Sequence, residues 1–508
     1  MRREAVLVRI GIAGLSILVG LLAVQALPLP GAAGLPAGAL VVGLVVLATI
    51  PIALERWPLA LAGFLIWLVV EDLVRKLTGN DIRVFFVKDL IFLLLLGGLF
   101  LDRRSRGVWR AATGPARAPL YALIAWAVVM SIPVLDEDWR LPLVGLRLHF
   151  LYLPLVVAGY LVARRAQRLS GWLAKVALLG AVASAVGIVQ AVIGPSFLAP
   201  DRETPGLGLL VTVRGFPDAE PVYRPAGTFV SSGRFAQAAL IALAVALAAV
   251  LARRGRPKAT AILPALVAGG AAWVAGGRAS FVVAACLVAV AAVAPGFSER
   301  RPGLHRSVLI AGVIAAAVIF VALFAPSVFS SRLSWYSATL DPSSPHSEWA
   351  SRWASHAAGT VRGIQIGGAF GQGTGVESLG KQYLTGDPSR SPEGLYQVEA
   401  GFGSIAVEWG VLGLGLWLAW TISWVRRQWR CVQAARDGPM AAVGLVLFAW
   451  VVLLLFVQFF GGLAIFQNYY ANAYFWLVSG VIFALPEAAA GLREAPRGER
   501  EHADVAAA

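Results

Sequence analysis

Long apolar segments, separated mostly by short polar connections, run along almost the whole chain. Each holds roughly twenty residues, enough for an α-helix to cross a hydrocarbon core about 30 Å thick. The segments do not alternate in polarity as barrel strands do, and backbone groups in lipid must be satisfied within a helix or a closed barrel. The pattern predicts an all-α polytopic membrane protein of about fourteen transmembrane helices. The expected spans are residues 6–27, 36–54, 57–74, 84–101, 119–135, 141–163, 172–194, 236–252, 259–275, 279–295, 307–325, 401–424, 440–461 and 471–486.

Two connections are much longer than the others. The resulting divisions are residues 1–193 (first group of transmembrane helices), 194–235 (first long loop), 236–325 (second group), 326–400 (larger loop), 401–487 (last group) and 488–508 (a charged tail, expected to be disordered). Long loops in compact proteins often carry function. A functional site is therefore expected in the two long loops.

The larger loop has local structure of its own. Residues 347–365 form an expected amphipathic helix, with Trp349 and Trp353 available to lie at the membrane surface. Residues 367–375 contain five glycines and predict a tight irregular turn. The larger loop is therefore expected to be partly helical.

Composition and charge agree with a membrane protein. Hydrophobic residues make up 58% of the chain and charged residues only 14%, against about 25% in soluble domains. The formal net charge of +15 would suggest nucleic acid in a soluble protein. Here the basic residues sit mainly in short connections that fall on one side of the predicted topology, while the acidic residues 136–138 fall on the other. The positive-inside rule then predicts cytoplasmic N- and C-termini, long loops outside, and no nucleic-acid partner.

Arginines in the two long outer loops are the first candidate site residues. Solvated surface charge is one explanation for them, because long translocated loops escape the charge rule. However, Arg224, Arg278 and Arg352 each lie beside glycines or at the mouth of an apolar span. Guanidinium groups match phosphate oxygens in a bidentate way. These three, with Arg214 and Arg234, are the candidate ligands of a pyrophosphate.

Two side chains are candidates for a catalytic base. Glu399 precedes a span and could accept a proton, or it could be a surface carboxylate at a helix N-terminus. His356 lies one helical turn after Arg352, on the same face of the expected helix. Glu408 is expected to be a buried structural partner of an outer-loop arginine. No metal-site or Walker motif is present, so neither a metal nor another cofactor is expected.

Other charged residues fall inside or at the ends of the predicted spans. Arg147 and His149, at the outer end of the sixth span, could line the cavity. The acidic pair at residues 71–72 and the Lys-Asp pair at residues 88–89 lie in neighbouring spans, where they could pair with each other or form a proton path.

Four short motifs occur in order between about residues 200 and 425. They are R-P-A-G-T-F at residues 224–229, G-R-A-S at 277–280, S-R-W at 351–353 with G-Q-G-T-G at 371–375, and E-W-G-V-L-G-L at 408–414. Together they resemble the R-x-x-G-T-F, S-R-x-x, R-x-x-x-W…G-x-G and E-x-G-h-h-G-h elements (h is apolar) of the bacterial O-antigen ligase and O-antigen polymerase superfamily.

The resemblance implies a GT-C-like glycosyltransferase in the bacterial inner membrane. Its donor would be a glycan on undecaprenyl pyrophosphate at the periplasmic face. Its acceptor would be another glycan, a lipid A core or a protein, and other polysaccharide assembly proteins could be partners. Arg224, Arg278 and Arg352 would hold the pyrophosphate, with Trp353, Gly373 and Glu408 as structural residues near the site.

One departure from the family bears on the reaction. Family ligases usually carry a His-Asn pair about nine residues before the conserved glutamate, whereas this chain has Glu399-Ala400 there. The departure favours a polymerase over a ligase. The competing hypothesis is a transporter or flippase of lipid-linked oligosaccharide, which the number of spans fits. Such a protein should show charges deep in several spans and symmetry between its halves.

Overall fold

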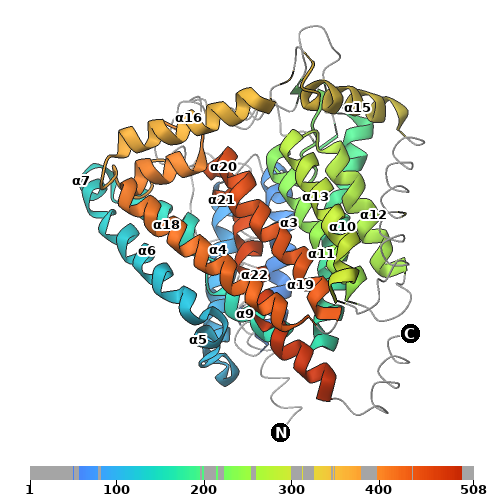
Figure 1. Ribbon diagram of the computed structural model, residues 1–508, viewed down its shortest axis with the longest axis horizontal. Helices are drawn as coiled ribbons and strands as arrows, with labels where there is room; N and C mark the ends of the chain where they lie inside the picture. Colours follow the sequence, from blue (N-terminus) through green and yellow to red (C-terminus); the bar gives the residue numbers. More distant parts are fainter. Residues whose placement is uncertain are drawn as a thin grey trace, which may run out of the picture.

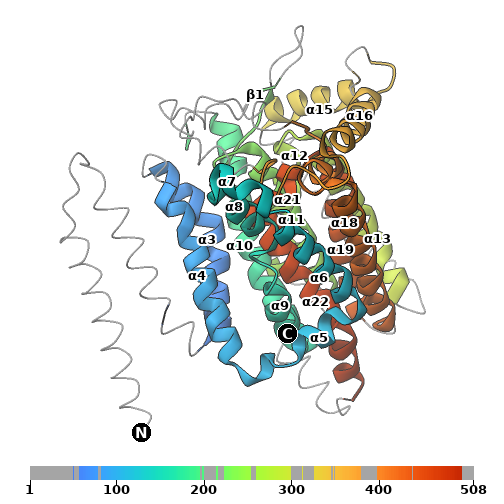
Figure 2. The same cartoon turned by 90° about the vertical axis from the view of Figure 1, so that its left-hand side faces the viewer.

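The structure is a computed structural model in which helices dominate. It describes residues 50, 56–77, 82–194, 197–198, 213–214, 222–252, 259–298, 312, 325–344, 347, 349–378, 397–436 and 439–494. The long helices form a bundle, and α15 (Pro326–Leu340) and α16 (Trp349–Gly367) lie across one end of it (Figure 1). The short helix α5 (Val108–Thr113) lies at the opposite end, as a second view confirms (Figure 2). We call these the α15/α16 end and the α5 end.

Nine helical segments in the described part of the chain are long and apolar enough to cross a membrane. They are Trp57–Leu77, Arg103–Val134, Arg140–Ala163, Ala166–Ile193, Ser232–Leu251, Arg278–Phe297, Gly401–Ala434, Pro439–Gly461 and Tyr469–Gly491. Their main helices are α3 (Trp57–Leu77), α6 (Arg117–Val129), α8 (Arg140–Phe150), α9 (Leu155–Ala163), α10 (Ala166–Ile193), α11 (Ser232–Leu251), α13 (Arg278–Ser298), α18 (Gly401–Ala434), α19 (Pro439–Val452) and α22 (Tyr469–Glu494). Two further apolar helices are α4 (Ile82–Leu101) and α12 (Ala259–Val274). The chain is therefore a multi-pass membrane protein by the length and composition of its helices.

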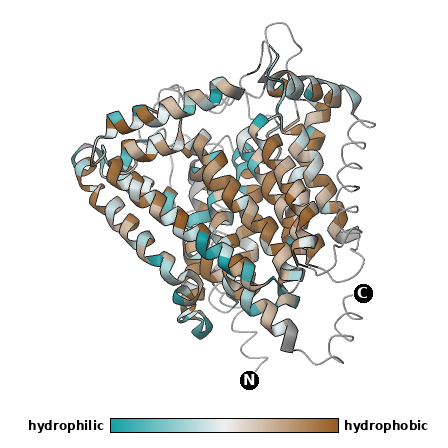
Figure 3. Cartoon of the chain, in the orientation of Figure 1, coloured by the Kyte–Doolittle hydropathy of each residue, from teal (hydrophilic) through white to brown (hydrophobic). Residues whose placement is uncertain are grey.

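Several boundaries differ from the predicted spans. Helix α18 continues to Ala434 and α22 to Glu494, so α22 enters the predicted tail 488–508. Arginine is a good helix former, and its long side chain can reach the membrane surface, so a helix need not stop where its apolar run stops. Figure 3 shows polar residues near α5 and the last turns of α18. The predicted spans 6–27, 36–54 and 307–325 lie outside the described residues, so the count of about fourteen stays a prediction.

Helix α11 occupies the centre of the bundle. Almost every side chain from Phe235 to Leu251 is buried, most of them alanine, leucine or valine. A helix that is apolar on all sides is expected where other helices surround it. Its neighbours include α10, α12, α13 and α19. This central helix begins directly after the first long loop and so connects that loop to the core.

Helices α9 and α22 pack closely against each other. A Cβ atom on Gly159 would lie 2.0 Å from the Leu477 carbonyl oxygen, and one on Gly480 would lie 2.0 Å from the Val156 carbonyl oxygen. Small residues at such contacts let two transmembrane backbones approach closely. The two glycines therefore set the distance between α9 and α22.

Gly159→Ala is expected to destabilise the protein by about 1–3 kcal/mol, because the added methyl group must push one backbone away from the other. Thermal unfolding of the purified protein in detergent measures the effect. Gly171→Ala on α10 is the matched control, since no atom lies within 4 Å of its Cβ position. Equal melting temperatures for the two variants would contradict the role of this contact.

The two long loops contain more structure than the sequence predicted. Helix α16 matches the expected helix at residues 347–365 to within two residues at each end. Helix α15 was not expected, nor was the two-stranded antiparallel pairing of β1 (Val213–Arg214) with β2 (Val222–Tyr223). Apolar positions in α15 do not form a long run, and the strands are only two residues each, so neither gives a strong periodic signal.

Helix α18 is broken at Gly410, which has φ 69° and ψ −174°. Residues 367–378, which we call the glycine strap, satisfy the backbone groups freed by the break. Gln372 and Gly373 donate their N–H groups to the Val407 and Glu408 carbonyls at 2.7 and 3.0 Å. In turn, Val411 N–H donates to the Gly368 carbonyl at 3.0 Å. Broken helices persist in membranes only where other groups make up such bonds, so strap and helix stabilise each other.

Candidate functional site

Three arginines converge on the turn between α12 and α13. The stem of Arg224 lies against Gly276, where a Cβ atom would be 2.8 Å from Arg224 Cγ. Arg278 is the first residue of α13, and its guanidinium carbon lies 5.2 Å from the centroid of the Trp335 ring. Arg332 of α15, almost fully buried, donates its Nε–H to the Val274 carbonyl at 3.0 Å. We call Arg224, Arg278 and Arg332 the arginine cluster.

The loop that carries Arg224 is held by polar side chains of neighbouring helices. Gln190 Oε1 accepts hydrogen bonds from the N–H groups of Ala226 and Gly227 at 2.8 and 2.6 Å. Lys76 Nζ donates to the Gly227 carbonyl at 2.8 Å. Because these bonds fix the backbone just after Arg224, the arginine is preorganised rather than free to move with a loop.

Three further predicted phosphate ligands belong to β1, α11 and α16. Arg234 Nη1 donates to Asp72 of α3 at 2.9 Å, so its charge is compensated inside the bundle. Arg214 lies on β1, paired with Val222 of β2. Arg352, on α16, lies with Nη1 3.9 Å from Glu399 Oε2. The structure therefore brings together Arg224 and Arg278 and adds Arg332. Arg332 was not predicted as a phosphate ligand, because in the sequence it is one of several arginines in the larger loop.

A pocket of about 300 Å³ lies between α16 and the segment that precedes α18. Its lining residues are Ser355, His356, Ala358, Gly359, Arg362, Gln397, Val398, Glu399 and Ala400. Both predicted bases, His356 and Glu399, belong to this set. They come from distant parts of the larger loop and meet because α16 packs along the start of α18.

The electrostatics of the pocket suit a neutral histidine. Partial burial holds the pKa of His356 below its ordinary value of 6.5, an effect that Arg352 reinforces and Glu399 opposes. The imidazole is therefore neutral at pH 7 and able to accept a proton. Phe460 orients this face of α16, because its ring stacks on Trp353 at 4.9 Å and meets the His356 ring edge-on at 5.7 Å. Trp353 thus has a packing role beside the pocket.

Glu408 lies deeper, at the break in α18. Its side chain is fully buried, with Oε2 3.3 Å from His149 Nε2. In the part of the chain that the structure describes, the partner of Glu408 is therefore a histidine of α8 and not the predicted arginine. Gly373 of the glycine strap has φ 121°, and a Cβ there would lie 2.0 Å from Val134 Cγ2. Both residues therefore support the strap and the helix break.

A network of buried charges crosses the interior of the bundle. Lys88 donates a hydrogen bond to Glu71 at 2.8 Å, and both side chains are fully buried. This is one of the pairings predicted between the charged residues of the two neighbouring spans. Asp89, by contrast, accepts from Arg147 Nε at 2.7 Å and from the Tyr152 hydroxyl at 3.0 Å. These pairs belong to α3, α4 and α8 and to the turn before α9, so the network ties the first helices to the rest of the bundle.

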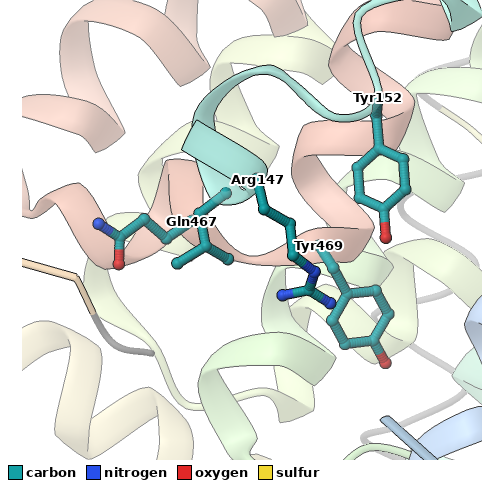
Figure 4. A pocket seen from close by; sticks show the side chains of 5 residues that line it. Arg147, Tyr152, Gln467 and Tyr469 are labelled. Atoms are coloured by element: carbon teal, nitrogen blue, oxygen red, sulfur yellow. The ribbon is translucent and has the colours of Figure 1, made fainter. Parts of the chain in front are cut away.

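A cavity of about 10 Å³ adjoins this network, with Arg147, Leu148, Tyr152, Gln467 and Tyr469 around it (Figure 4). That volume is near the lower limit for one water molecule. Figure 4 shows Arg147 extending toward the Tyr469 ring. Arg147 therefore lines an internal cavity, whereas His149 of the same helix turns to Glu408. In the ranges that the structure describes, no group of His, Cys, Asp or Glu side chains could hold a metal ion.

No family model matches the chain, and the curated proteins give no match either.

Proposed function

We propose that this protein transfers or polymerises glycans from undecaprenyl-pyrophosphate donors at the periplasmic face of the bacterial inner membrane, as the resemblance to the O-antigen ligase and polymerase superfamily implies. The observation that carries the proposal is that two chemically distinct groups lie at the α15/α16 end. One is the arginine cluster, suited to a diphosphate. The other is the pocket with His356 and Glu399, suited to a hydroxyl acceptor.

The proposed reaction displaces a diphosphate from an anomeric carbon. His356 or Glu399 accepts the proton of the acceptor hydroxyl, and the acceptor oxygen bonds to the anomeric carbon of the donor sugar. The bond from that carbon to the diphosphate oxygen breaks, and the diphosphate leaves with the electron pair. Arg224 and Arg278 stabilise the negative charge that develops on it. The donor already carries an activated leaving group, so no nucleotide takes part in this step.

The acceptor decides between two outcomes within the proposal. A second lipid-linked repeat unit makes the protein a polymerase of O-antigen or exopolysaccharide, which the Glu399-Ala400 sequence favours. A lipid A core or a protein makes it a ligase. Other polysaccharide assembly proteins are proposed partners because they would supply the lipid-linked substrate.

The second candidate function is transport or flipping of a lipid-linked oligosaccharide. Charged groups inside the bundle favour it, since ionisable groups inside a membrane bundle often mark transport paths. They are the buried residues Glu71, Asp72, Lys88 and Asp89 and the partly buried Arg147. A structural role explains the ion pairs among these residues equally well, because the pairs hold α3, α4 and α8 together. We therefore place the enzyme first.

Product length in reconstituted membranes tests the proposal. Purified protein receives a lipid-pyrophosphate-linked repeat unit, and we expect a ladder of lengthened lipid-linked glycan. His356→Ala and Glu399→Gln each remove one candidate base. The variant that lacks the true base is expected to transfer glycan about 10²–10⁴-fold more slowly than the wild type. Glu487→Gln, a matched change in an exposed carboxylate near the α5 end, should retain the wild-type rate.

Transfer only after addition of a lipid A core or a protein would identify a ligase. Movement of lipid-linked sugar across the membrane without any transfer would contradict the proposed enzyme activity and support the transporter hypothesis.

A further inference from the structure

Arg332 of α15 is a buried cation that is bonded mainly to the main chain. The residue is only 2% exposed. Its Nε donates to the Val274 carbonyl at 3.0 Å, and its Nη2 donates to the Tyr223 carbonyl. The third nitrogen, Nη1, lies 3.5 Å from Ser331 Oγ. Because a buried arginine is tolerated only when its N–H groups are bonded, these partners stabilise its place in the interior.

The two carbonyls belong to the segments that carry the other arginines of the cluster. Tyr223 ends β2 and directly precedes Arg224. Val274 ends α12, four residues before Arg278. One guanidinium group therefore joins the ends of two segments that are far apart in the chain. The planar fork of arginine suits this role, since its N–H groups point to two acceptors in fixed directions.

Other side chains of α15 bind the same turn. Trp335 Nε1 donates to the Gly276 carbonyl at 3.2 Å, and its ring centroid lies 5.2 Å from the guanidinium carbon of Arg278. The Tyr336 hydroxyl donates to the Trp273 carbonyl at 2.8 Å. Figure 1 shows α15 lying across this end of the bundle. Helix α15 is therefore the support on which the turn between α12 and α13 rests.

Aromatic packing fixes α15 independently of Arg332. The rings of Phe281 and Tyr336 stack with their centroids 4.4 Å apart. Those of Trp273 and Phe329 stack at 5.2 Å. Phe281 belongs to α13 and Trp273 to α12, so both neighbouring helices take part. Such pairs stabilise beyond the area that they bury, and a substitution of Arg332 is therefore expected to leave α15 attached.

We propose that Arg332 is a positioning residue: by joining the ends of β2 and α12, it holds Arg224 and Arg278 at the spacing at which both bind one diphosphate. Arg224 and Arg278 are partly exposed, so a ligand can reach them, whereas the fork of Arg332 is enclosed. Two guanidinium groups bind one diphosphate well only when they are held in register. The diphosphate rests on the proposed function, but the joining of the two segments does not.

Two variants separate the geometry of Arg332 from its charge. Arg332→Lys keeps the charge but lacks the planar fork that meets both carbonyls. Arg332→Met removes the charge together with the bonds. It is the second variant in case the lysine variant does not fold, because an apolar side chain needs no counter-charge in the interior.

Hydrogen exchange of residues 222–229 and 274–281 measures the joining without any ligand. One ammonium group cannot keep both carbonyl bonds, so Arg332→Lys is expected to raise the exchange of both segments about tenfold. Arg426→Lys, a matched change in an exposed arginine of α18, should exchange as the wild type does. Exchange of the two segments at the wild-type rate in the Arg332 variants would overturn the proposal.

Binding of inorganic pyrophosphate to the purified protein shows whether Arg332 acts through its neighbours. Isothermal titration calorimetry in detergent is the measurement. We expect Arg332→Lys and Arg332→Met each to bind pyrophosphate about tenfold more weakly than the wild type. In an Arg278→Ala background, the same changes are expected to weaken binding by less than about threefold, because only Arg224 remains to be positioned.

Three results of the titration would overturn the positioning role. One is a loss of equal size in the two backgrounds, since Arg332 would then act independently of Arg278. Another is wild-type affinity in Arg332→Lys, because charge alone would then suffice. The third is a wild type that does not bind pyrophosphate.

The transfer assay separates this inference from the proposed function. If both hold, Arg332→Lys transfers glycan about tenfold more slowly than the wild type, and the loss shrinks in the Arg278→Ala background. The expected pyrophosphate result without any transfer would contradict the proposed enzyme activity and leave the positioning role of Arg332. Transfer by Arg332→Lys at the wild-type rate would overturn the positioning role alone.

Discussion

Arg278→Ala is expected to lower the rate of the proposed glycan transfer by about a hundredfold to a thousandfold, the usual cost of removing one preorganised group that stabilises developing charge. Arg278 begins α13 beside Gly277, and its guanidinium lies over the Trp335 ring. Arg224 approaches the same turn, with Nη2 3.7 Å from the Cβ position of Gly277. Two adjacent cations at a helix N-terminus favour a dianionic leaving group more than either does alone.

Two further variants separate the causes of this loss. Arg278→Lys keeps the charge but not the planar fork, so an intermediate rate is expected if bidentate binding matters. Arg426→Ala changes an exposed arginine of α18 at the α5 end and should leave transfer unchanged. Initial rates of lipid-linked glycan formation in proteoliposomes, normalised to protein content, give the comparison. Transfer by Arg278→Ala at the wild-type rate would remove the arginine cluster from the proposed mechanism.

Lys88→Ala is expected to destabilise the protein by about 3–5 kcal/mol, because it leaves a buried carboxylate without its counter-charge. Lys88 Nζ lies 2.8 Å from Glu71 Oε1, and both side chains have no exposed surface. Glu71 Oε2 already lacks a hydrogen-bond partner. Loss of the lysine would also remove the hydrogen bond that Oε1 accepts from Lys88. Thermal unfolding in detergent is the measurement, with expression level as a second readout.

An exposed ion pair of the same length supplies the control. Arg164 and Glu487 are also 2.8 Å apart, but their side chains are 46% and 44% exposed. Arg164→Ala is therefore expected to cost at most about 1 kcal/mol. The double variant Glu71→Leu/Lys88→Met should recover much of the stability, since apolar groups of similar size need no counter-charge. Equal losses of stability for Lys88→Ala and Arg164→Ala would show that breaking the buried Glu71–Lys88 pair costs no more than breaking the exposed Arg164–Glu487 pair.

Local features of the sequence predicted the elements that depend on local physics. The spans 236–252 and 259–275 match α11 and α12 to within a few residues, because an apolar run in lipid has to form a helix. The amphipathic helix α16 and the irregular glycine turn were also predicted. Positive φ angles at Gly371, Gly373 and Gly375 explain why glycine occurs there.

Features that depend on packing between distant segments were missed. The break at Gly410 lies in an apolar run that reads as one span, and only the glycine strap makes it tolerable. The burial of Arg332 gave no signal, because an arginine in a polar loop is normally exposed. The Trp-Gly-Val sequence at residues 409–411 could have suggested a break, since glycine is weak inside a helix.

The sequence by itself determined that the chain spans a membrane many times, which connections are basic, and which residues could bind phosphate or accept a proton. Only the tertiary structure decided their partners: Arg234 meets Asp72, His149 meets Glu408, and Arg332 joins Arg224 and Arg278. The physical reason is the range of each effect. Hydrophobicity and backbone hydrogen bonding act within one segment, so sequence records them directly. The partner of a charge depends on which helices pack together, and that is fixed by side-chain contacts far apart in the chain.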